Sequence, residues 1–272
     1  MMAVRSLLSV SCRSAIRPTK LVHCRLMSSS GLLIDRLRTT ARALAPEHPF
    51  KRSVTHQNAR SVMGKYLGMS QAFPYLQAGA YVGLIRNAMK KNCSISPDVE
   101  KTFVAGSFLC WDETGGHHLV SAQGNGALPK ALDTEQHFHS RLLERDLVEI
   151  FGQPVPPNYC PSTRAYLIKL SDKLGSPNKV TRVAMMVSFE MHAETMLLAL
   201  WDSISKITMI PKDELTYFQT HVGGDDPAEA YHVALTQRLV KELVSSSEEG
   251  RFEKQFAKLY QLNLNWCQAI VK

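Results

Sequence analysis

The sequence predicts an all-α protein folded as one helical bundle. Apolar residues recur at helical spacing almost everywhere after residue 30, and no stretch shows the alternation typical of a half-buried strand. Segments rich in Gly and Pro, such as "TGGHHLVSAQGNGALP" and "GQPVPPNYCPS", separate the helical stretches. Because 272 residues suffice for one large domain with a substantial core, we expect a single all-α domain over residues 31–272.

Helices are expected in order along the chain, each bounded by residues that begin or end helices. The stretch "SGLLIDRLRTTARALA" is amphipathic and opens the domain. Ser96-Pro97-Asp98 marks another start, since proline fits the first helical turn. The expected helical ranges are 30–45, 56–70, 72–91, 97–113, 131–151, 162–173, 179–206, 213–222, 227–247 and 250–270.

The first 30 residues have the composition of a mitochondrial transit peptide. They contain seven serines, no acidic residue, and the basic residues Arg5, Arg13, Arg17, Lys20 and Arg25. Arginines interrupt the apolar residues, so a secretory signal fits less well. We therefore expect residues 1–30 to be a transit peptide and the protein to be mitochondrial, in the matrix.

The net charge of +8 comes largely from that segment, and the rest of the chain is close to +3. Bulk charge therefore gives no reason to expect nucleic-acid binding. No apolar run approaches the ~18–20 residues of a membrane-spanning helix, so no membrane span is expected. Hydrophobic content of 44% and charged content of 21% are ordinary for a globular protein.

The six cysteines form no recognisable framework. Two lie in the expected transit peptide and four are scattered, with no C-x-x-C pair: Cys12, Cys24, Cys93, Cys110, Cys160 and Cys267. This pattern argues against a zinc ribbon or a disulfide scaffold and favours reduced thiols.

Carboxylates on apolar helix faces are the first candidates for a site. In "VTRVAMMVSFEMHAETMLLALWDSI", Glu190 and Glu194 share a stripe with Val187 and Trp201. A buried, unpaired carboxylate costs several kcal/mol, so each should be paired, protonated or metal-bound. The alternative is that one of them pairs with a core Arg or Tyr.

Two further candidates occupy apolar stripes of other helices. Glu113 follows Leu109 on one stripe, and Gly115-Gly116 then ends the helix; the alternative is a solvated glutamate. His139 aligns with Leu143, and the alternative is a hydrogen-bonded core histidine.

The stretch "FQTHVGGDDPAEAYH" interrupts two helical segments. His221 and Asp225 stand at i,i+4 on one face. In a straight helix His232 would lie ~16 Å further along the axis, but the Gly-Gly-Asp-Asp-Pro break permits a closer approach. We assign Asp226 to a helix cap, with Glu229 completing a D-x-x-E box, which leaves Asp225 as a candidate ligand.

These candidates form an oxygen- and nitrogen-rich set without thiolates. Such ligands suit non-haem iron or manganese, whereas structural zinc favours cysteine. Helical bundles host dinuclear carboxylate sites of this chemistry, and the spacing leaves the number of metal ions open.

The candidate residues resemble those of the haem-oxygenase-like di-iron oxidases. That family shares its fold with the TenA/thiaminase-II proteins and the chlamydial protein associating with death domains. The similar positions are Glu113 in "WDETGG", His139 in "HFHSRLL", Glu190 in "SFEMHAE", and His221 with Asp225 in "THVGGD". The likeness covers about residues 95–240 and includes "CPSTRAYLIKL".

The sequence also departs from the family pattern. A final histidine is expected where Ala228 stands, and His232 comes four residues later; we assign the last ligand to His232. His117, His118 and Glu194 are the reserve candidates.

The resemblance implies a haem-oxygenase-like/TenA-like helical bundle holding two iron ions, with manganese as the alternative metal. It also implies activation of O2 to oxidise a small organic substrate, with electrons from an unidentified donor, and is compatible with a homodimer. The alternative function is a metal-free TenA-like hydrolase, with Cys110 as nucleophile, or a small-molecule-binding protein. A helical interaction protein is a third hypothesis.

Overall fold

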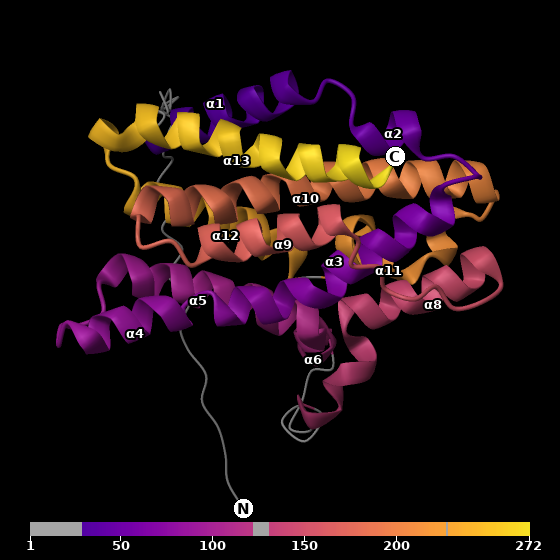
Figure 1. Cartoon of the computed structure of the whole chain (residues 1–272), viewed down its shortest axis with the longest axis horizontal. Helices are drawn as coiled ribbons and strands as arrows, with labels where there is room; N and C mark the ends of the chain where they lie inside the picture. The colour runs from indigo at the N-terminus through magenta and orange to yellow at the C-terminus, as the bar shows by residue number, and fades with distance from the viewer. Residues whose placement is uncertain (1–28, 122–130, 227) are drawn as a thin grey trace, which may run out of the picture.

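The structure, a computed structural model, describes residues 29–121, 131–226 and 228–272. All regular elements in these ranges are helical, and none of the described residues forms a strand. The longer helices lie side by side in an elongated bundle (Figure 1). The all-α prediction is confirmed, while most of the expected transit peptide, residues 1–28, lies outside the described residues.

Most helices begin and end close to the residues that were expected to bound them. The longer helices are α1 (Ser29–Leu44), α3 (Ala59–Gly79), α5 (Pro97–Trp111), α8 (His139–Phe151), α9 (Pro161–Leu174), α10 (Lys179–Thr208), α12 (Glu229–Leu243) and α13 (Glu249–Ile270). The short helices are α2 (Pro49–Ser53), α4 (Val82–Lys90), α6 (His117–Ser121) and α11 (Thr216–Phe218). Tighter 3-10 turns are η2 (Ala131–His137), η3 (Lys212–Glu214) and η5 (Ser246–Glu248), and two wider π-helical turns are η1 (Asp112–Gly116) and η4 (Gln219–Gly223).

Several expected bounds are wrong. The expected helix 131–151 is divided into η2 and α8, the expected helix 213–222 is divided into η3, α11 and η4, and α2 was not expected. Residues 56–70 and 72–91 were expected to be separate helices, but α3 runs through that point and ends at Gly79, and α4 begins at Val82. Met69, Ser70 and Phe73 are buried on either side of position 71, and the helix continues through Pro74, so core packing rather than local propensity carries it past this point.

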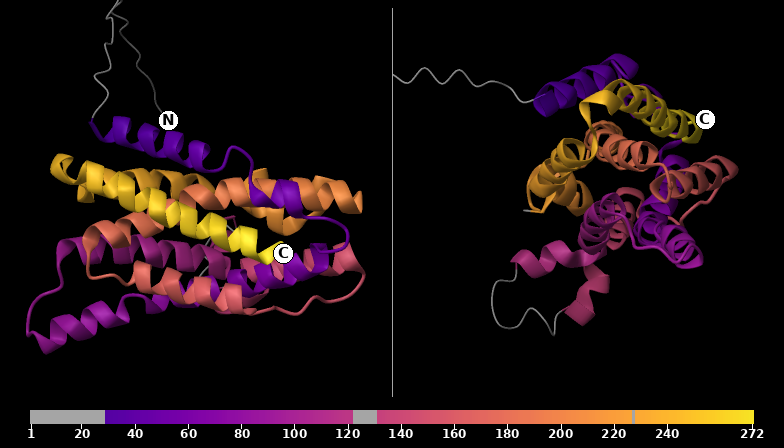
Figure 2. Two further views of the ribbon diagram at one scale, coloured as in Figure 1. Left: turned by 45° about the horizontal axis from the view of Figure 1, so that its top comes forward. Right: turned by 90° about the vertical axis from the view of Figure 1, so that its left-hand side faces the viewer.

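Helix α10 is the central element of the bundle. It contacts α13, α12, α9, α2 and α5, and the end-on view shows the other helices arranged around this core (Figure 2). By length and hydropathy alone α10 would qualify as a membrane-spanning helix, but 67% of its most apolar stretch is buried inside the bundle. The Asn178 side chain caps its first turn by accepting a hydrogen bond from the Thr181 amide at 3.0 Å.

A buried arginine fixes α5, the helix that leads into the site, against α10. The guanidinium of Arg182 is fully buried, forms an ion pair with Asp98, and donates to the Thr102 hydroxyl at 2.9 Å. Its remaining donor reaches the Ser176 carbonyl at 2.6 Å. Because breaking a buried, fully bonded charge network is costly, this contact holds α5 in one position along α10.

Candidate metal centre

The end of α5 presents two adjacent carboxylates. After Trp111 the helix widens into η1, and Gly115 takes a left-handed conformation with φ of 85°. A side chain at Gly115 would also meet the Thr134 carbonyl oxygen at 2.6 Å, so only glycine fits this turn. Single π-helical turns are frequent at functional sites, and this one places Asp112 and Glu113 at the end of the helix.

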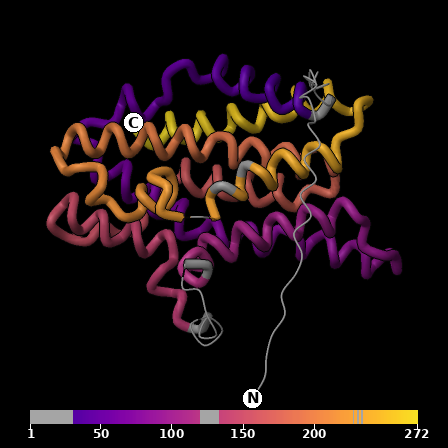
Figure 3. Tube along the Cα trace, turned by 180° about the vertical axis from the view of Figure 1, so that it is seen from behind, coloured from indigo at the N-terminus to yellow at the C-terminus, as the bar shows by residue number. Residues whose placement is uncertain are grey.

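The segment that carries His221 is fixed by a carboxylate from another helix. Asp146 of α8 accepts hydrogen bonds from the Thr216 and Tyr217 amides, each at 2.9 Å. These bonds cap the start of α11, which continues directly into η4 with His221. Gly224, with φ of 95°, follows η4 in a left-handed conformation, before α12. Figure 3 shows the bundle from behind, with its long helices side by side.

Glu113, His139 and His221 converge on one point inside the bundle. One ligand atom of each lies within 4.8 Å of the other two. Nδ1 of His139 is 3.4 Å from a Glu113 carboxylate oxygen, and the rings of His139 and His221 are 4.4 Å apart between centroids. Three elements distant in sequence therefore supply two imidazoles and one carboxylate.

The two imidazoles direct unused nitrogens toward this point. His221 Nδ1 lies 2.7 Å from Glu229 Oε1, so Nδ1–H donates to the carboxylate and leaves Nε2 as a lone pair. His139 Nε2 lies 3.0 Å from His117 Nδ1; with the proton on Nε2, the lone pair is on Nδ1. Both His139 Nδ1 and His221 Nε2 are buried without a hydrogen-bond partner. Histidines that bind metals typically donate their other ring N–H in this way.

A second group of acidic side chains surrounds His232. Its Nδ1 lies 3.1 Å from Glu190 Oε2 and 3.5 Å from Glu229 Oε2, and its Nε2 lies 3.1 Å from Asp112 Oδ2. Burial disfavours the charged ring, but the hydrogen bonds and charges of these carboxylates outweigh it and raise the pKa of His232 to about 11. Without a metal, a protonated imidazole thus balances the carboxylates.

Burial acts on the other titratable groups as well. It raises the pKa of Glu113 and of Glu190, and it lowers the pKa of His139 well below its usual range. The pKa of His221 is raised because the bond to Glu229 outweighs burial. A divalent cation could supply the positive charge that the protonated His232 ring gives these buried carboxylates.

Asp226 extends the cluster beside Asp112. It is 4% exposed, and its Oδ1 accepts from the Ala228 amide at 2.7 Å. Asp226 Oδ2 and Asp112 Oδ1 are both buried without a partner, and ligand atoms of these two residues, His117 and His139 lie within 4.8 Å of one another. Burial and the neighbouring carboxylate raise the pKa of Asp226 to about 7.

A cavity of about 970 Å³ adjoins the cluster. Its wall includes Glu113, Glu190, His221, Glu229 and His232 on the side of the cluster. The rest of the wall combines apolar residues, among them Met69, Phe73, Leu109, Phe189, Met196 and Leu197, with polar and charged ones such as Arg38, Lys51 and Glu194. Apolar surface combined with convergent polar groups is typical of a small-molecule site.

The structure gathers most of the residues expected from the sequence, but not all. Glu113, His139, Glu190, His221 and His232 meet in the cluster, and the reserve candidate His117 joins them. The remaining expected residues are not part of the cluster: Asp225 is exposed, Glu194 is exposed and lines the adjoining cavity, and His118 stacks on His137 at 3.5 Å between ring centroids.

The expected ligand role of Asp225 is corrected, because Asp225 faces solvent. Asp226, expected as a cap, does accept a hydrogen bond from the Ala228 amide before α12, but it is also buried beside Asp112. The left-handed Gly224 turns the backbone between His221 and Asp225, so the i,i+4 relation of a straight helix is lost.

Sequence reasoning missed Asp112 and Glu229. Glu229 was assigned to a capping box, yet its carboxylate contacts both His221 and His232. The missed signal is Glu229-x-x-His232, because a Glu-x-x-His pair on one helix is the form that carboxylate-bridged metal sites take in bundles. Asp112 carried no comparable signal, since only the widened turn η1 brings it inward.

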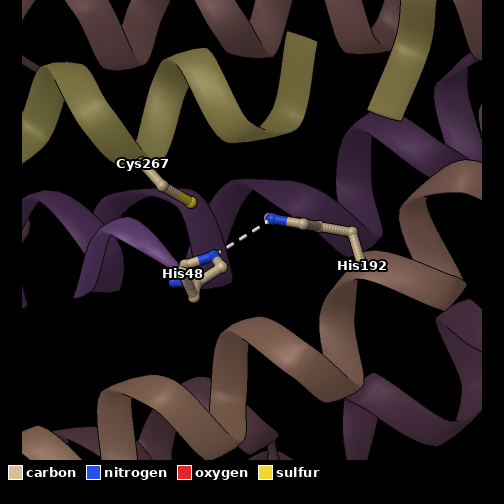
Figure 4. Close-up of side chains that lie close together, drawn as sticks. All are labelled: His48, His192 and Cys267. Atoms are coloured by element: carbon tan, nitrogen blue, oxygen red, sulfur yellow. Dashed lines mark hydrogen bonds between the residues drawn. The ribbon is translucent and has the colours of Figure 1, made fainter. Parts of the chain in front are cut away.

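A second buried cluster joins His48, His192 and Cys267 (Figure 4). His48 Nδ1 accepts a hydrogen bond from the Phe50 amide at 3.2 Å, so its proton is on Nε2. His48 Nε2–H therefore donates to His192 Nε2, and the two nitrogens are 3.2 Å apart. Burial holds the pKa of the Cys267 thiol well above its usual range. This cluster contains no carboxylate, and none of its nitrogens is among the buried atoms of the described residues that lack a partner.

Comparison with known proteins supports the fold. No family model matches the chain, and no curated protein matches it. The structure is similar to the crystal structure of a CADD-like protein of unknown function from Nostoc punctiforme, with a TM-score of 0.61 and 16% identity, covering 89% of this chain and 98% of that one. CADD-like proteins have the haem-oxygenase-like helical fold, so the protein is a haem-oxygenase-like bundle, as the sequence predicted. Groups of His, Asp and Glu that could hold a metal lie inside it.

Proposed function

We propose that the protein is a non-haem iron oxidase or oxygenase, most simply with two iron ions, that uses O2 to oxidise a small organic substrate. One observation carries the proposal: the unpartnered nitrogens of His139 and His221 converge with the Glu113 carboxylate. Two histidines and one carboxylate are the ligand set of many non-haem Fe(II) oxygenases. Manganese is the alternative metal.

The residues present fit two adjacent cations. Glu113, His139 and His221 would hold one, and Glu190, Glu229 and His232 would hold the other. Bound iron would supply the reduction of O2, with electrons from an external donor.

The surrounding residues orient the ligands and exclude water. Glu229 and His117 fix which ring nitrogens of His221 and His139 are free, and Asp112 does the same for His232 by accepting its Nε2–H. The apolar cavity wall would bind the substrate and keep water from the reacting atoms.

The hydrolase alternative receives less support. Cys110 is the cysteine expected on the site face, but burial raises the pKa of its thiol to about 11. Its Sγ donates to the Pro74 carbonyl at 3.2 Å. A nucleophilic cysteine needs a lowered pKa and an adjacent base.

The test is anaerobic loading with Fe(II), followed by removal of free metal and measurement of iron per folded chain. Wild-type protein should retain about two ions, and Glu113→Ala and His221→Ala should lose at least one. Matched controls are Glu149→Ala and His56→Ala, because both side chains are exposed. A folded wild-type chain that retains no iron at neutral pH, or ligand variants that retain as much as wild type, would overturn the proposal.

We also propose that residues 1–30 direct the protein to the mitochondrial matrix. The test compares two reporter fusions: one carries this segment, and the other carries a variant of it in which the five basic residues become Gln. Import of the first fusion and not of the second would support the proposal; equal distribution would contradict it.

A further inference from the structure

A row of aromatic rings leads away from the candidate metal centre. The Tyr217 ring lies 4.6 Å from the His221 ring, and its hydroxyl lies 2.8 Å from the Tyr66 hydroxyl. Tyr66 stacks on Trp266 at 6.4 Å between centroids, and Trp266 stacks on Tyr166 at 4.8 Å. The row crosses from α11 through α3 and α13 to α9, with each ring in contact with the next.

All four aromatic residues are at most 4% exposed, and burial raises the pKa of each of the three phenols. They are therefore neutral. Tyr and Trp are the side chains that lose one electron most readily, and a neutral phenol must lose its proton at the same time. The contact between the Tyr66 and Tyr217 hydroxyls provides a path for that proton.

The position of the pair relative to the cavity separates it from ordinary core packing. Tyr66 and Tyr217 both line the cavity, together with Glu113 and His221. Here the two hydroxyls bond to each other between the cluster and the rest of the aromatic row.

We propose that Tyr217 and Tyr66 form a redox relay that removes oxidising equivalents from the centre when O2 reacts without substrate, with Trp266 and Tyr166 extending the path toward α9. The inference rests on the proposed oxidase function. The oxidant derived from O2 takes one electron and one proton from the Tyr217 hydroxyl. Tyr66 then gives its hydroxyl electron and proton to Tyr217, so Tyr217 is restored and Tyr66 becomes a neutral radical.

A thiol reductant closes the sequence of steps. Each thiol returns one electron, through Tyr166 and Trp266, and one proton to Tyr66, and two such thiols combine into one disulfide. The relay thereby protects the ligands and the cavity wall from oxidation.

The experiment mixes iron-loaded full-length protein with O2 in the absence of substrate, freezes it at intervals, and records electron paramagnetic resonance. Wild type should give a tyrosyl radical signal that added thiol removes. Tyr217→Phe should lower that signal at least tenfold, and Tyr66→Phe should change its lineshape because the radical remains on Tyr217. Tyr260→Phe is the matched control, since Tyr260 is equally buried but packs on His192 and Phe256.

A second readout follows damage in the same samples. Mass spectrometry should find severalfold more oxidation of Met69 and Phe189, which line the cavity, in Tyr217→Phe than in wild type or Tyr260→Phe. Iron content and O2 consumption are measured for every variant before mixing.

These measurements separate the two proposals. Wild type that binds no iron or consumes no O2 overturns the oxidase function and the relay with it. Protein that binds iron and consumes O2 but forms no tyrosyl radical overturns the relay alone. The relay alone is also overturned if Tyr217→Phe gives the same tyrosyl radical signal and the same oxidation of cavity residues as wild type.

Discussion

Two buried clusters in this bundle each bring together side chains that could bind a metal, and they differ in their hydrogen bonds. In the cluster around His139 and His221, ring nitrogens and carboxylate oxygens remain without partners. In the cluster of His48, His192 and Cys267, the two imidazoles bond to each other and to the backbone. Proximity of ligand-type side chains is common to both, so proximity alone does not define a metal site.

The unpartnered atoms carry the distinction because they have an energetic consequence. Seven buried side-chain atoms among the described residues lack a partner, and four belong to the first cluster: Asp112 Oδ1, His139 Nδ1, His221 Nε2 and Asp226 Oδ2. Each such atom costs about 1–3 kcal/mol, and native structures contain few of them. The first cluster therefore has unsatisfied buried atoms that a cation could bind, whereas no atom of the second cluster is among the unpartnered buried atoms of the described residues.

The largest expected effect is stabilisation by metal at the first cluster only. Fe(II) at a thousandfold excess over its dissociation constant should raise the free energy of unfolding by about 4 kcal/mol. Glu113→Gln should lose this gain, while His48→Asn should retain it. Anaerobic urea unfolding with and without Fe(II) measures both; an equal gain in Glu113→Gln, or a lost gain in His48→Asn, would remove the distinction between the clusters.

The next effect belongs to the second cluster and depends on pH. Burial, together with the nearby Lys51 and Arg52, lowers the pKa of His48 from 6.5 to about 4 in the folded state. Between these values the unfolded chain binds the proton and the folded chain does not. The contribution of His48 to the free energy of unfolding is therefore fully present above pH 6.5, and it falls by about 3 kcal/mol as the pH drops to 4.

The acid effect is isolated with His48→Asn, whose amide oxygen can still accept the hydrogen bond from the Phe50 amide. The difference in unfolding free energy between wild type and variant should shrink as the pH falls from 6.5 to 4. A difference that stays constant over this range would show that His48 does not remain neutral in the fold.

A smaller effect tests how the first cluster is positioned. Asp146→Asn leaves one amide acceptor for the two backbone N–H groups of Thr216 and Tyr217, which should cost about 2 kcal/mol. Because the same bonds fix the segment carrying His221, iron affinity should fall as well. Asp172→Asn, an exposed change on α9, is the control, and urea unfolding with iron titration gives both values. A stability loss without a change in affinity would separate the cap from the metal centre.

The sequence predicted the helices well because their signals are local. Helix α5 begins at Pro97 and α10 at Lys179, the positions at which the sequence predicted helix starts. Glu113, His139 and Glu190 were found because an apolar stripe identifies which polar side chains point inward. The rest depended on non-helical backbone: η1 turns Asp112 inward, and the break at Gly224 exposes Asp225 and brings Glu229 to His221. Periodicity assumes a regular helix and fails where the backbone widens or turns.

The smallest expected effect distinguishes the neighbouring aspartates. Asp225 is exposed, so Asp225→Asn should leave stability within about 0.5 kcal/mol of wild type and iron affinity unchanged. Asp226→Asn removes an unpartnered buried carboxylate beside Asp112, and iron affinity should fall about tenfold, as for residues that surround metal ligands. Without metal the same change should not destabilise the fold, because the amide can donate to Asp112 Oδ1 and relieve the repulsion between the two acids. Iron titration and urea unfolding of both variants test this; if Asp225→Asn weakens iron binding more than Asp226→Asn does, the turn after His221 presents the other aspartate to the metal.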